Sequence, residues 1–185
     1  MLWRNMEEFR IYSITDRYIE YLQAQCPNVY SNKADHRTHT RKYIGTVMEI
    51  NDVFYYIPMS SPKESDYQLA GDAKVVKKSI IPIVRIVVKN SKGIKELKGT
   101  LRISHMIPVP VSELIAYDVD AEQDENYRNL VRDELVFIRR NKEKIASYAK
   151  VMYKQKAEKY PAGYVNSALD YKELEKLCEK YEQQH

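Results

Sequence analysis

Cysteine is scarce in this sequence, and long apolar runs are missing. The 185 residues include two cysteines, Cys26 and Cys178, which are too few for a disulfide framework, and no Cys/His spacing indicates a zinc site. No apolar stretch reaches the length of a transmembrane helix, and residues 1–8 lack the apolar core of a secretory signal. We therefore expect a soluble, cytoplasmic protein that works without a metal or other cofactor and without a membrane partner.

The sequence also lacks a complete serine-hydrolase motif and a complete calcium-binding loop. No Gly-x-Ser-x-Gly turn and no recognisable His/Asp partner set accompany the serines, which disfavours a serine hydrolase or acyltransferase. Residues 118–124 alternate acids as a calcium loop does, but the turn glycine and the bidentate glutamate are not at the required spacing, so an acidic, solvated loop is expected. With no internal repeat and 44% hydrophobic residues, residues 1–185 are most simply one domain with one core.

What the sequence does contain is a strong segregation of charge. Residues 74–102 carry nine Lys or Arg against one acid, Glu96, whereas residues 103–127 carry six acids and no Lys or Arg. A second basic cluster occupies residues 33–42. On a chain whose net charge is only +4, such blocks favour a face that binds a polyanion, and a solvated surface is the alternative.

Alternating and β-branched apolar residues dominate the first part of the chain. The elements expected there are strands at residues 8–14, 79–89 and 100–106, a hairpin at residues 42–63, a short helix at residues 17–25, and loops at residues 29–41 and 64–78. Residues 90–99 form a basic connection, either a longer hairpin or a short helix. Residues 107–111 contain two prolines and should be extended.

Helical periodicity dominates the second part. Apolar residues recur near a 3.6-residue period at residues 122–141, 142–160 and 171–183, and Asp170 is placed to cap the last helix. An order of strands first and helices later predicts an α+β fold with a small antiparallel sheet or barrel. The sheet or barrel core should occupy about residues 8–111, and the helical part residues 112–185.

The predicted hairpin ends in a group of polar side chains. Two β-branched and aromatic runs flank Asn51 and Asp52, which is typical of an antiparallel hairpin. The second run ends in Ser60-Ser61-Pro62-Lys63, where the proline should stop the ladder. Two hydroxyls and an ammonium are thereby presented at a strand end, a common place for functional residues, although most Ser-Pro pairs are plain turns.

Four stretches, at residues 12–22, 41–45, 56–63 and 135–145, resemble the toxins of type III toxin–antitoxin systems, the ToxN/AbiQ family of endoribonucleases. Met-Ser-Ser-Pro-Lys at residues 59–63 is the most specific of them. The resemblance implies an SH3-like barrel related to the MazF/Kid toxins and elaborated with helices. It also implies metal-independent RNA cleavage, preferentially at adenine-rich sites, and inhibition by a small repeated pseudoknot RNA whose precursor the toxin processes.

The resemblance further implies the catalytic residues Tyr18, Arg41, Ser60, Ser61 and Lys63. Cleaving RNA without a metal needs a base for the 2′-proton, an acid for the leaving oxygen and cations for the charge at phosphorus. Lys63 and Arg41 could supply the cations, Lys63 could also move a proton, and the serines could orient the phosphate. Some relatives have Lys and Thr where this chain has Arg41 and Ser60. A tyrosine that packs a helix face is the alternative for Tyr18.

RNA contacts beyond the scissile step are expected from basic and aromatic side chains. An aromatic residue that some relatives carry on the late helix falls at Arg132 here, so Tyr127 or Phe137 could serve instead. Stacking on tyrosines and phosphate contacts by cations are the usual means of holding single-stranded RNA. The expected RNA-binding residues are Lys33, Arg37, Lys42, Lys74, Lys77, Lys78, Tyr127 and Arg132.

Several alternatives stay open at this point. His36 and His39 could act as acid–base groups or simply lie on the surface, and His105 is expected to be structural. A catalytically silent RNA-binding barrel would bind the same RNA but release no cyclic phosphate. The expected partners are an RNA antitoxin and cellular or phage RNA substrates, with toxin and antitoxin assembled into a hetero-oligomer.

Overall fold

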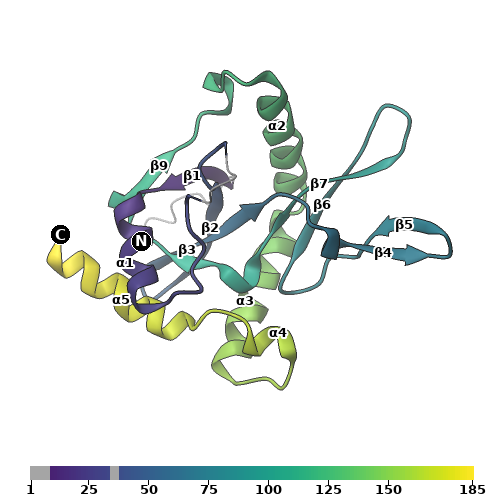
Figure 1. Cartoon of the computed structure of the whole chain (residues 1–185). Helices are drawn as coiled ribbons and strands as arrows, with labels where there is room; N and C mark the ends of the chain where they lie inside the picture. Colours follow the sequence, from purple (N-terminus) through teal and green to yellow (C-terminus); the bar gives the residue numbers. More distant parts are fainter. Residues whose placement is uncertain (1–8, 34–37) are drawn as a thin grey trace.

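The protein is an α+β protein built on an antiparallel sheet (Figure 1). The structure, a computed structural model, describes residues 9–33 and 38–185. The strands of the main sheet are β1 (Arg10–Ile14), β2 (Tyr43–Ile50), β3 (Val53–Ser60), β6 (Val84–Lys89), β7 (Lys95–Leu101), β8 (Ile107–Pro108) and β9 (Leu114–Ala116). Their order is β6-β7-β3-β2-β1-β9, and β8 also pairs with β3. The expected α+β class is confirmed.

The β2–β3 hairpin is the centre of the sheet. Asn51 and Asp52 adopt φ angles of 50° and 62°, and Ile50 pairs with Val53 across the turn. Asn and Asp tolerate this left-handed conformation better than most residues, and it suits the twist of a two-residue hairpin turn. The ladder ends at Ser60, two residues before Pro62, so the predicted hairpin and its end are confirmed.

One helix lies between β1 and β2, and the other helices follow the sheet in sequence. The helices are α1 (Asp16–Gln25), α2 (Glu125–Arg140), α3 (Lys142–Ala157), α4 (Gly163–Asn166) and α5 (Tyr171–Gln184). Helix α2 packs against β6 and β7, α3 against β2, and α5 against β8. The side chain of Asp170 accepts a hydrogen bond from the Glu173 backbone N–H at 3.1 Å, which confirms the predicted cap. In the described ranges, no helix has both the length and the apolar character needed to cross a membrane.

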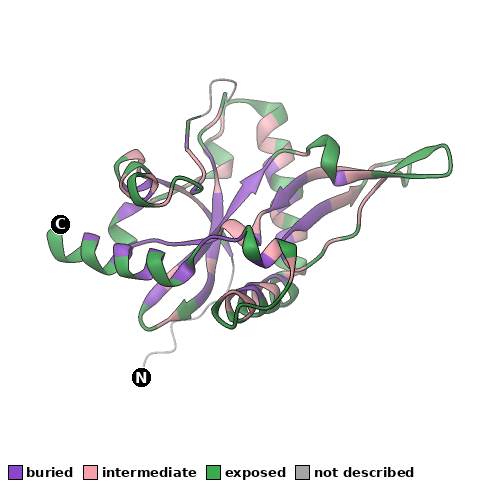
Figure 2. Cartoon of the chain, turned by 60° about the horizontal axis from the view of Figure 1, so that its bottom comes forward, coloured by how far each residue is buried: buried purple, intermediate pink, exposed green. Residues whose placement is uncertain are grey.

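The hydrophobic core lies along the middle of the sheet, where the ribbon is buried (Figure 2). Ile44, Ile57 and Leu101 contribute side chains with no exposed surface. Helix α5 alternates buried and exposed positions, and its buried stripe includes Leu174 and Cys178 as its periodicity predicts. Strand β3 is therefore buried on both faces, and Ser60, its last residue, lies at the boundary of the core.

One predicted loop is wrong. Residues 64–78 contain a short 3-10 helix (Glu64–Asp66) and a separate hairpin of β4 (Tyr67–Ala70) and β5 (Ala73–Val76), which projects from the molecule as an arm (Figure 1). Gly71 has a φ of 63° in the turn, a conformation that glycine adopts without strain. The arm contributes little to the core, since Leu69 is 76% exposed. A strand pair without a buried face lacks the alternating pattern by which strands are predicted.

Two other expectations differ from the structure. The strand predicted at residues 100–106 stops at Leu101, and residues 103–105 form a 3-10 helix. This strand begins at Lys95 and pairs with β6 across a turn at Gly93, so the longer hairpin expected as one alternative for residues 90–99 is confirmed. Strand β9 lies in the region expected to be helical and pairs with β1. Among the described residues no pairing joins the edge strands β6 and β9, so a closed barrel is not confirmed and stays a prediction.

Candidate functional site

A groove of about 570 Å³ opens at the end of β3, between the segment that leads into β2 and the side of α2. Its wall includes six of the residues expected from the sequence: Arg41, Lys42, Ser60, Ser61, Lys63 and Tyr127. Residues far apart in sequence meet here because β2 and β3 are paired and α2 packs against the neighbouring strand β7. The groove is therefore the candidate functional site.

Arg41 holds the end of β3 in place. Its side chain is buried, with only 7% of the residue exposed, and its Nη1 donates hydrogen bonds to the Met59 carbonyl oxygen and to the Ser60 hydroxyl. Its Nε donates to the Ser31 carbonyl oxygen at 3.2 Å. The guanidinium thereby orients the Ser60 hydroxyl and brings a positive charge to the groove wall.

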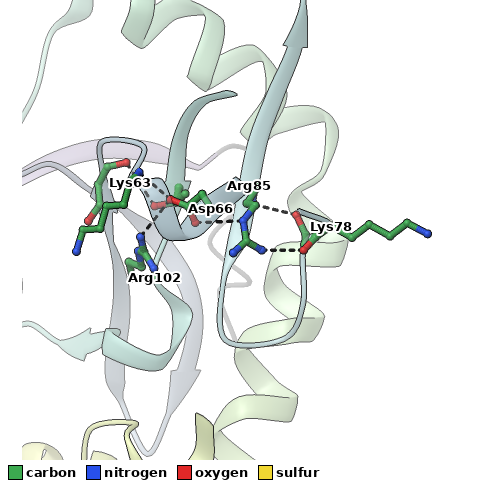
Figure 3. Close-up of polar contacts among 8 residues, drawn as sticks. Lys63, Asp66, Lys78, Arg85 and Arg102 are labelled. Carbon is green, nitrogen blue, oxygen red and sulfur yellow. Dashed lines mark hydrogen bonds and ion pairs between the residues drawn. The ribbon is translucent and has the colours of Figure 1, made fainter. Parts of the chain in front are cut away.

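Asp66 holds the other end of the Ser-Ser-Pro-Lys element (Figure 3). Its carboxylate has no exposed surface and accepts a hydrogen bond from the Lys63 backbone N–H at 2.9 Å. Arg85 Nε donates to the same carboxylate at 3.1 Å, and Arg102 lies 3.5 Å from it. These two cations offset the cost of burying the carboxylate.

The Lys63 side chain points away from this ion cluster, whereas its backbone is bound to it (Figure 3). The residue is exposed, and no group among the described residues forms a hydrogen bond or ion pair with its ammonium. Ser61 is exposed beside it. A phosphate that enters the groove can thus meet an ammonium and a hydroxyl on a backbone element that is held at both ends, at Ser60 and at Lys63.

Tyr30 lines the same groove between two other groups. The Arg41 guanidinium lies 4.6 Å from the centre of the tyrosine ring, and the ring of His105 stacks on it at 4.3 Å. Burial and the charges of Arg102, Arg41 and Lys63 lower the pKa of His105 to about 4, so its ring is neutral at pH 7. The ring of His105 packs behind Tyr30, and the structural role expected for it stays a prediction.

Lys42 is half-buried in the groove wall. Its ammonium donates to the Thr40 carbonyl oxygen at 3.1 Å and lies 4.5 Å from the centre of the Tyr117 ring. Burial lowers the pKa of Lys42, and the more distant charge of Glu122 partly opposes this effect. Sequence reasoning assigned Lys42 only to RNA binding, but a lysine whose pKa is depressed is also suited to proton transfer.

Helix α2 forms the opposite wall. Tyr127 stacks on His39 with ring centres 3.7 Å apart, and Leu130, Val131 and Glu134 follow along the same face. The 3.6-residue period of the helix could have identified this face from the sequence, because residues 127, 131 and 134 lie on one side. Nothing in the sequence indicated that this side meets the end of β3 rather than the core alone.

Tyr18 is not part of the groove. It has no exposed surface, its hydroxyl donates to the Pro108 carbonyl oxygen at 2.8 Å, and its ring packs edge-on against Tyr181. Its alternative role, a tyrosine that packs a helix face, matches this position. We therefore correct the sequence-based assignment and leave Tyr18 out of the site, since a fully buried ring cannot contact RNA in this conformation.

Other expected RNA-binding residues lie outside the groove. Lys33 forms an ion pair with Asp16, and Arg132 forms one with Asp120. Lys74 lies on the arm, where it pairs with Glu64. Lys77 and Lys78 follow β5, and the Lys78 side chain points away from Asp66 (Figure 3). Arg37 and His36 lie outside the described residues. Exposed pairs of this kind are weak, so the lysines remain available to phosphates.

The charge of the groove is mainly positive, from Arg41, Lys42, Lys63 and Lys98. Within the described part of the chain, no group of three or more His, Cys, Asp or Glu side chains is arranged to hold a metal ion. The wall thus offers cations, hydroxyls and aromatic rings, which is the set of groups that binds phosphates and bases.

Comparison with known proteins agrees with this chemistry. A family model described as "Toxin ToxN, type III toxin-antitoxin system" matches residues 10–179. Endoribonuclease AbiQ of Lactococcus lactis subsp. lactis is 30% identical over 93% of this chain and 88% of its own length. Endoribonuclease ToxN of Bacillus thuringiensis subsp. kurstaki is 23% identical over 97% of this chain and 87% of its own length.

Solved structures share the fold. A structure of AbiQ, described as a lactococcal anti-phage endoribonuclease of a type III toxin–antitoxin system, has a TM-score of 0.75 at 25% identity and covers 95% of this chain and 99% of that chain. A structure from work on toxin inhibition by a non-coding RNA pseudoknot has a TM-score of 0.76 at 23% identity, with the same coverage. With a family match over most of its length and a groove of this composition, the chain belongs to the ToxN family of type III toxin–antitoxin toxins.

Proposed function

We propose that this chain is an endoribonuclease toxin that cleaves RNA by attack of the 2′-hydroxyl, without a metal, at adenine-rich sites. The observation that carries the proposal is the meeting of Ser60, Ser61 and Lys63 with Arg41 and Lys42 in one groove. These residues come from both sides of the β2–β3 hairpin, and each supplies a group that the reaction needs. The relatives AbiQ and ToxN are named endoribonucleases, which supports the same reaction class.

The reaction assigns a task to each group. The 2′-oxygen bonds to phosphorus and loses its proton, while the bond from phosphorus to the 5′-oxygen breaks and that oxygen takes up a proton. The products carry a 2′,3′-cyclic phosphate and a 5′-hydroxyl. In this proposal Lys63 and Arg41 stabilise the negative charge at phosphorus, Ser61 donates to a phosphate oxygen, and Lys42, whose pKa burial lowers, accepts the 2′-proton.

Membership in this family also suggests how the activity of the toxin is controlled, namely by an RNA antitoxin. We expect a small repeated pseudoknot RNA to occupy the groove, the toxin to process the precursor of this RNA, and toxin and RNA to assemble into a hetero-oligomer in the cytoplasm. The description of AbiQ as anti-phage and the work on inhibition by an RNA pseudoknot support this role. The positive groove supplies the attraction for such a partner.

The test is cleavage of single-stranded RNA by the purified full chain in the presence of excess EDTA. We expect cleavage at full rate and products that end in a 2′,3′-cyclic phosphate, detected by mass spectrometry. An activity that EDTA abolishes and magnesium restores would contradict the mechanism. A chain that binds the RNA tightly but releases no product would instead be a catalytically silent RNA-binding protein.

A further inference from the structure

Glu134 is an acid in the groove to which the proposed reaction has so far given no task. It lies on α2, is 7% exposed and lines the groove together with Leu130 and Val131. A Cβ atom on Gly99 of β7 would overlap its Oε1, and the Ser60 carbonyl oxygen lies 3.2 Å from the same point. Glycine at position 99 therefore makes room for the carboxyl group beside the end of β3, next to Ser60.

The carboxyl group of Glu134 is not bound to any other residue that the structure describes. Within the described ranges it forms no hydrogen bond and no ion pair, and the neighbouring Lys98 pairs with Glu96 and Asp133 instead. Buried polar groups are nearly always hydrogen-bonded in native structures, so one that faces a cavity without a partner points to a ligand. The Ser60 carbonyl oxygen, which lies near the same point, is a partial negative charge that disfavours an ionised carboxylate there.

The surroundings keep this carboxyl group protonated at neutral pH. Burial, helped by the charge of Asp133 on the same helix, raises the pKa of Glu134 to about 8. The cations that share the groove wall oppose this rise: Lys98 from β7, Lys63 after β3, and Arg41 and Lys42 before β2. An RNA phosphate bound near Glu134 would neutralise these cations and favour the protonated form.

We propose that Glu134 is the general acid of RNA cleavage, which gives its proton to the leaving 5′-oxygen. In this step the bond from phosphorus to the 5′-oxygen breaks, its electron pair stays on that oxygen, and the oxygen takes the proton from the Glu134 carboxyl group. The resulting carboxylate regains a proton from water before the next cycle. This inference rests on the proposed endoribonuclease function and adds the group that the reaction still lacks.

Other groups in the groove are less suited to this step. Arg41 does not release its proton at physiological pH, and its Nη1 is engaged with Met59 and Ser60. His39 is stacked on Tyr127 and lies 3.6 Å from Asp124. Glu134 is an uncharged donor at neutral pH that forms no hydrogen bond with the other residues of the described ranges, so it can donate without breaking a contact seen there.

The test compares two substrates in the full chain. One is a single-stranded RNA of a sequence the wild type cleaves, and the other is the same RNA with sulfur in place of the 5′-bridging oxygen. A thiolate leaves without protonation, so it needs no general acid. We expect Glu134→Gln to lose on the order of 100-fold in kcat on the oxygen substrate and to lose little on the sulfur substrate. Glu125→Gln, an exposed change on the same helix, is the matched control and should act as wild type on both.

A pH profile provides the second readout. The wild-type kcat on the oxygen substrate should fall as pH rises through about 8, because Glu134 then loses its proton. This decline should be absent for the sulfur substrate. Asp133→Asn removes a neighbouring negative charge and should move the decline to lower pH. Melting temperatures and binding of an RNA with 2′-deoxyribose at the scissile nucleotide report whether each variant is folded and binds.

The outcomes separate the inference from the function on which it rests. Equal losses of Glu134→Gln on both substrates would show a structural or binding role and overturn the general-acid assignment, as would an unchanged rate on the oxygen substrate. In either case the endoribonuclease proposal stands. A wild-type chain that binds but cleaves neither substrate would contradict the endoribonuclease function itself.

Discussion

Nη1 of Arg41 lies 3.0 Å from the Met59 carbonyl oxygen and 3.0 Å from the hydroxyl oxygen of Ser60. The side chain that was expected from the sequence to supply a cation therefore uses two of its nitrogens, Nε and Nη1, in hydrogen bonds to the protein itself. Its fork geometry fixes the Ser60 hydroxyl, and its charge still faces the groove. Arg41 thus positions the end of β3 and also supplies a positive charge to the groove.

Arg41→Lys should therefore cost both activity and stability. A single ammonium cannot reach Ser31, Met59 and Ser60 together, and each lost bond to a charged group costs about 1.5–3 kcal/mol. Urea unfolding and cleavage kinetics measure the two effects, with the exposed Arg140→Lys as control. If Arg41→Lys had normal activity and His39→Ala were inactive, His39 would be an acid–base group, and the acid–base roles proposed for other groove residues would be wrong.

Ser61→Ala and Lys63→Ala should each lose roughly 100-fold or more in cleavage rate, the scale of one lost donor to a developing oxyanion. Because both residues are exposed and the other cations remain, stability should hardly change and RNA binding should weaken less than the rate. Single-turnover kinetics and filter binding separate these quantities. Ser91→Ala and Lys92→Ala in the exposed turn before β7 are matched controls, and a rate equal to theirs would remove Ser61 or Lys63 from the site.

Asp66→Asn should lower kcat through Lys63. The amide still accepts a hydrogen bond from the Lys63 N–H, but it leaves the charges of Arg85 and Arg102 uncompensated beside the element. Breaking a buried pair by removing one partner typically costs about 3–5 kcal/mol, so stability should fall as well. Kinetics well below the melting temperature isolate the effect on rate.

A double variant distinguishes positioning from general damage. If Asp66 acts through Lys63, adding Asp66→Asn to Lys63→Ala should lower the rate little further, since the two changes remove the same contribution. Asp72→Asn at the exposed tip of the arm is the control. Independent, fully additive losses would contradict the positioning role.

His105 makes stability depend on pH. Its pKa is about 4 in the folded protein, below the ordinary value of 6.5, so the unfolded chain binds a proton more readily. The stabilisation is present above pH 6.5 and is lost as pH falls towards 4, by up to about 3 kcal/mol. His105→Phe keeps a ring against Tyr30 without titration, and it should flatten urea-unfolding stability between these pH values. If the stability of the wild type and of His105→Phe fell equally between these pH values, His105 would not be the source of the pH dependence.

Lysines on the β4–β5 arm and directly after it should contribute strongly to the salt dependence of antitoxin binding. Replacing Lys74, Lys77 and Lys78 by Ala should reduce the slope of log affinity against log salt by about 2, since each single-strand phosphate contact contributes about 0.7. Cleavage of a short RNA that does not reach the arm should be unchanged. Titrations at several salt concentrations measure the slope, and an unchanged slope would show that the arm does not touch the RNA.

How far the sequence predicts this molecule depends on how strongly each segment is buried. Helices α2, α3 and α5 bury one face against the core, which leaves a helical period in the sequence, and the β2–β3 hairpin is buried on both faces, which leaves two runs of β-branched and aromatic residues. The arm buries almost nothing, and β9 is three residues long, so neither leaves such a pattern. These elements, together with the four-residue helix α4, are the ones that the sequence missed.

The residues of the candidate site also fall into two groups, those that a local motif identifies and those that only folding brings together. Ser60, Ser61 and Lys63 were found because they share one short stretch with a known family, and Arg41 because it begins another such stretch at residues 41–45. Tyr30, Glu134 and His105 meet this stretch only through tertiary packing, over separations that no local pattern records. Tyr18 was misassigned for the converse reason: its position in a familiar motif does not reveal that its ring is enclosed.

The Ser-Ser-Pro-Lys element is fastened at two points three residues apart. Arg41 fixes Ser60, and Asp66 fixes the backbone of Lys63. Inserting one residue between these points would move an end by up to about 3.5 Å and break one of the two attachments, whereas a change of residue type at Pro62 need break neither. Variation in this family of toxins should therefore be tolerated in the composition of the element and rejected in its length.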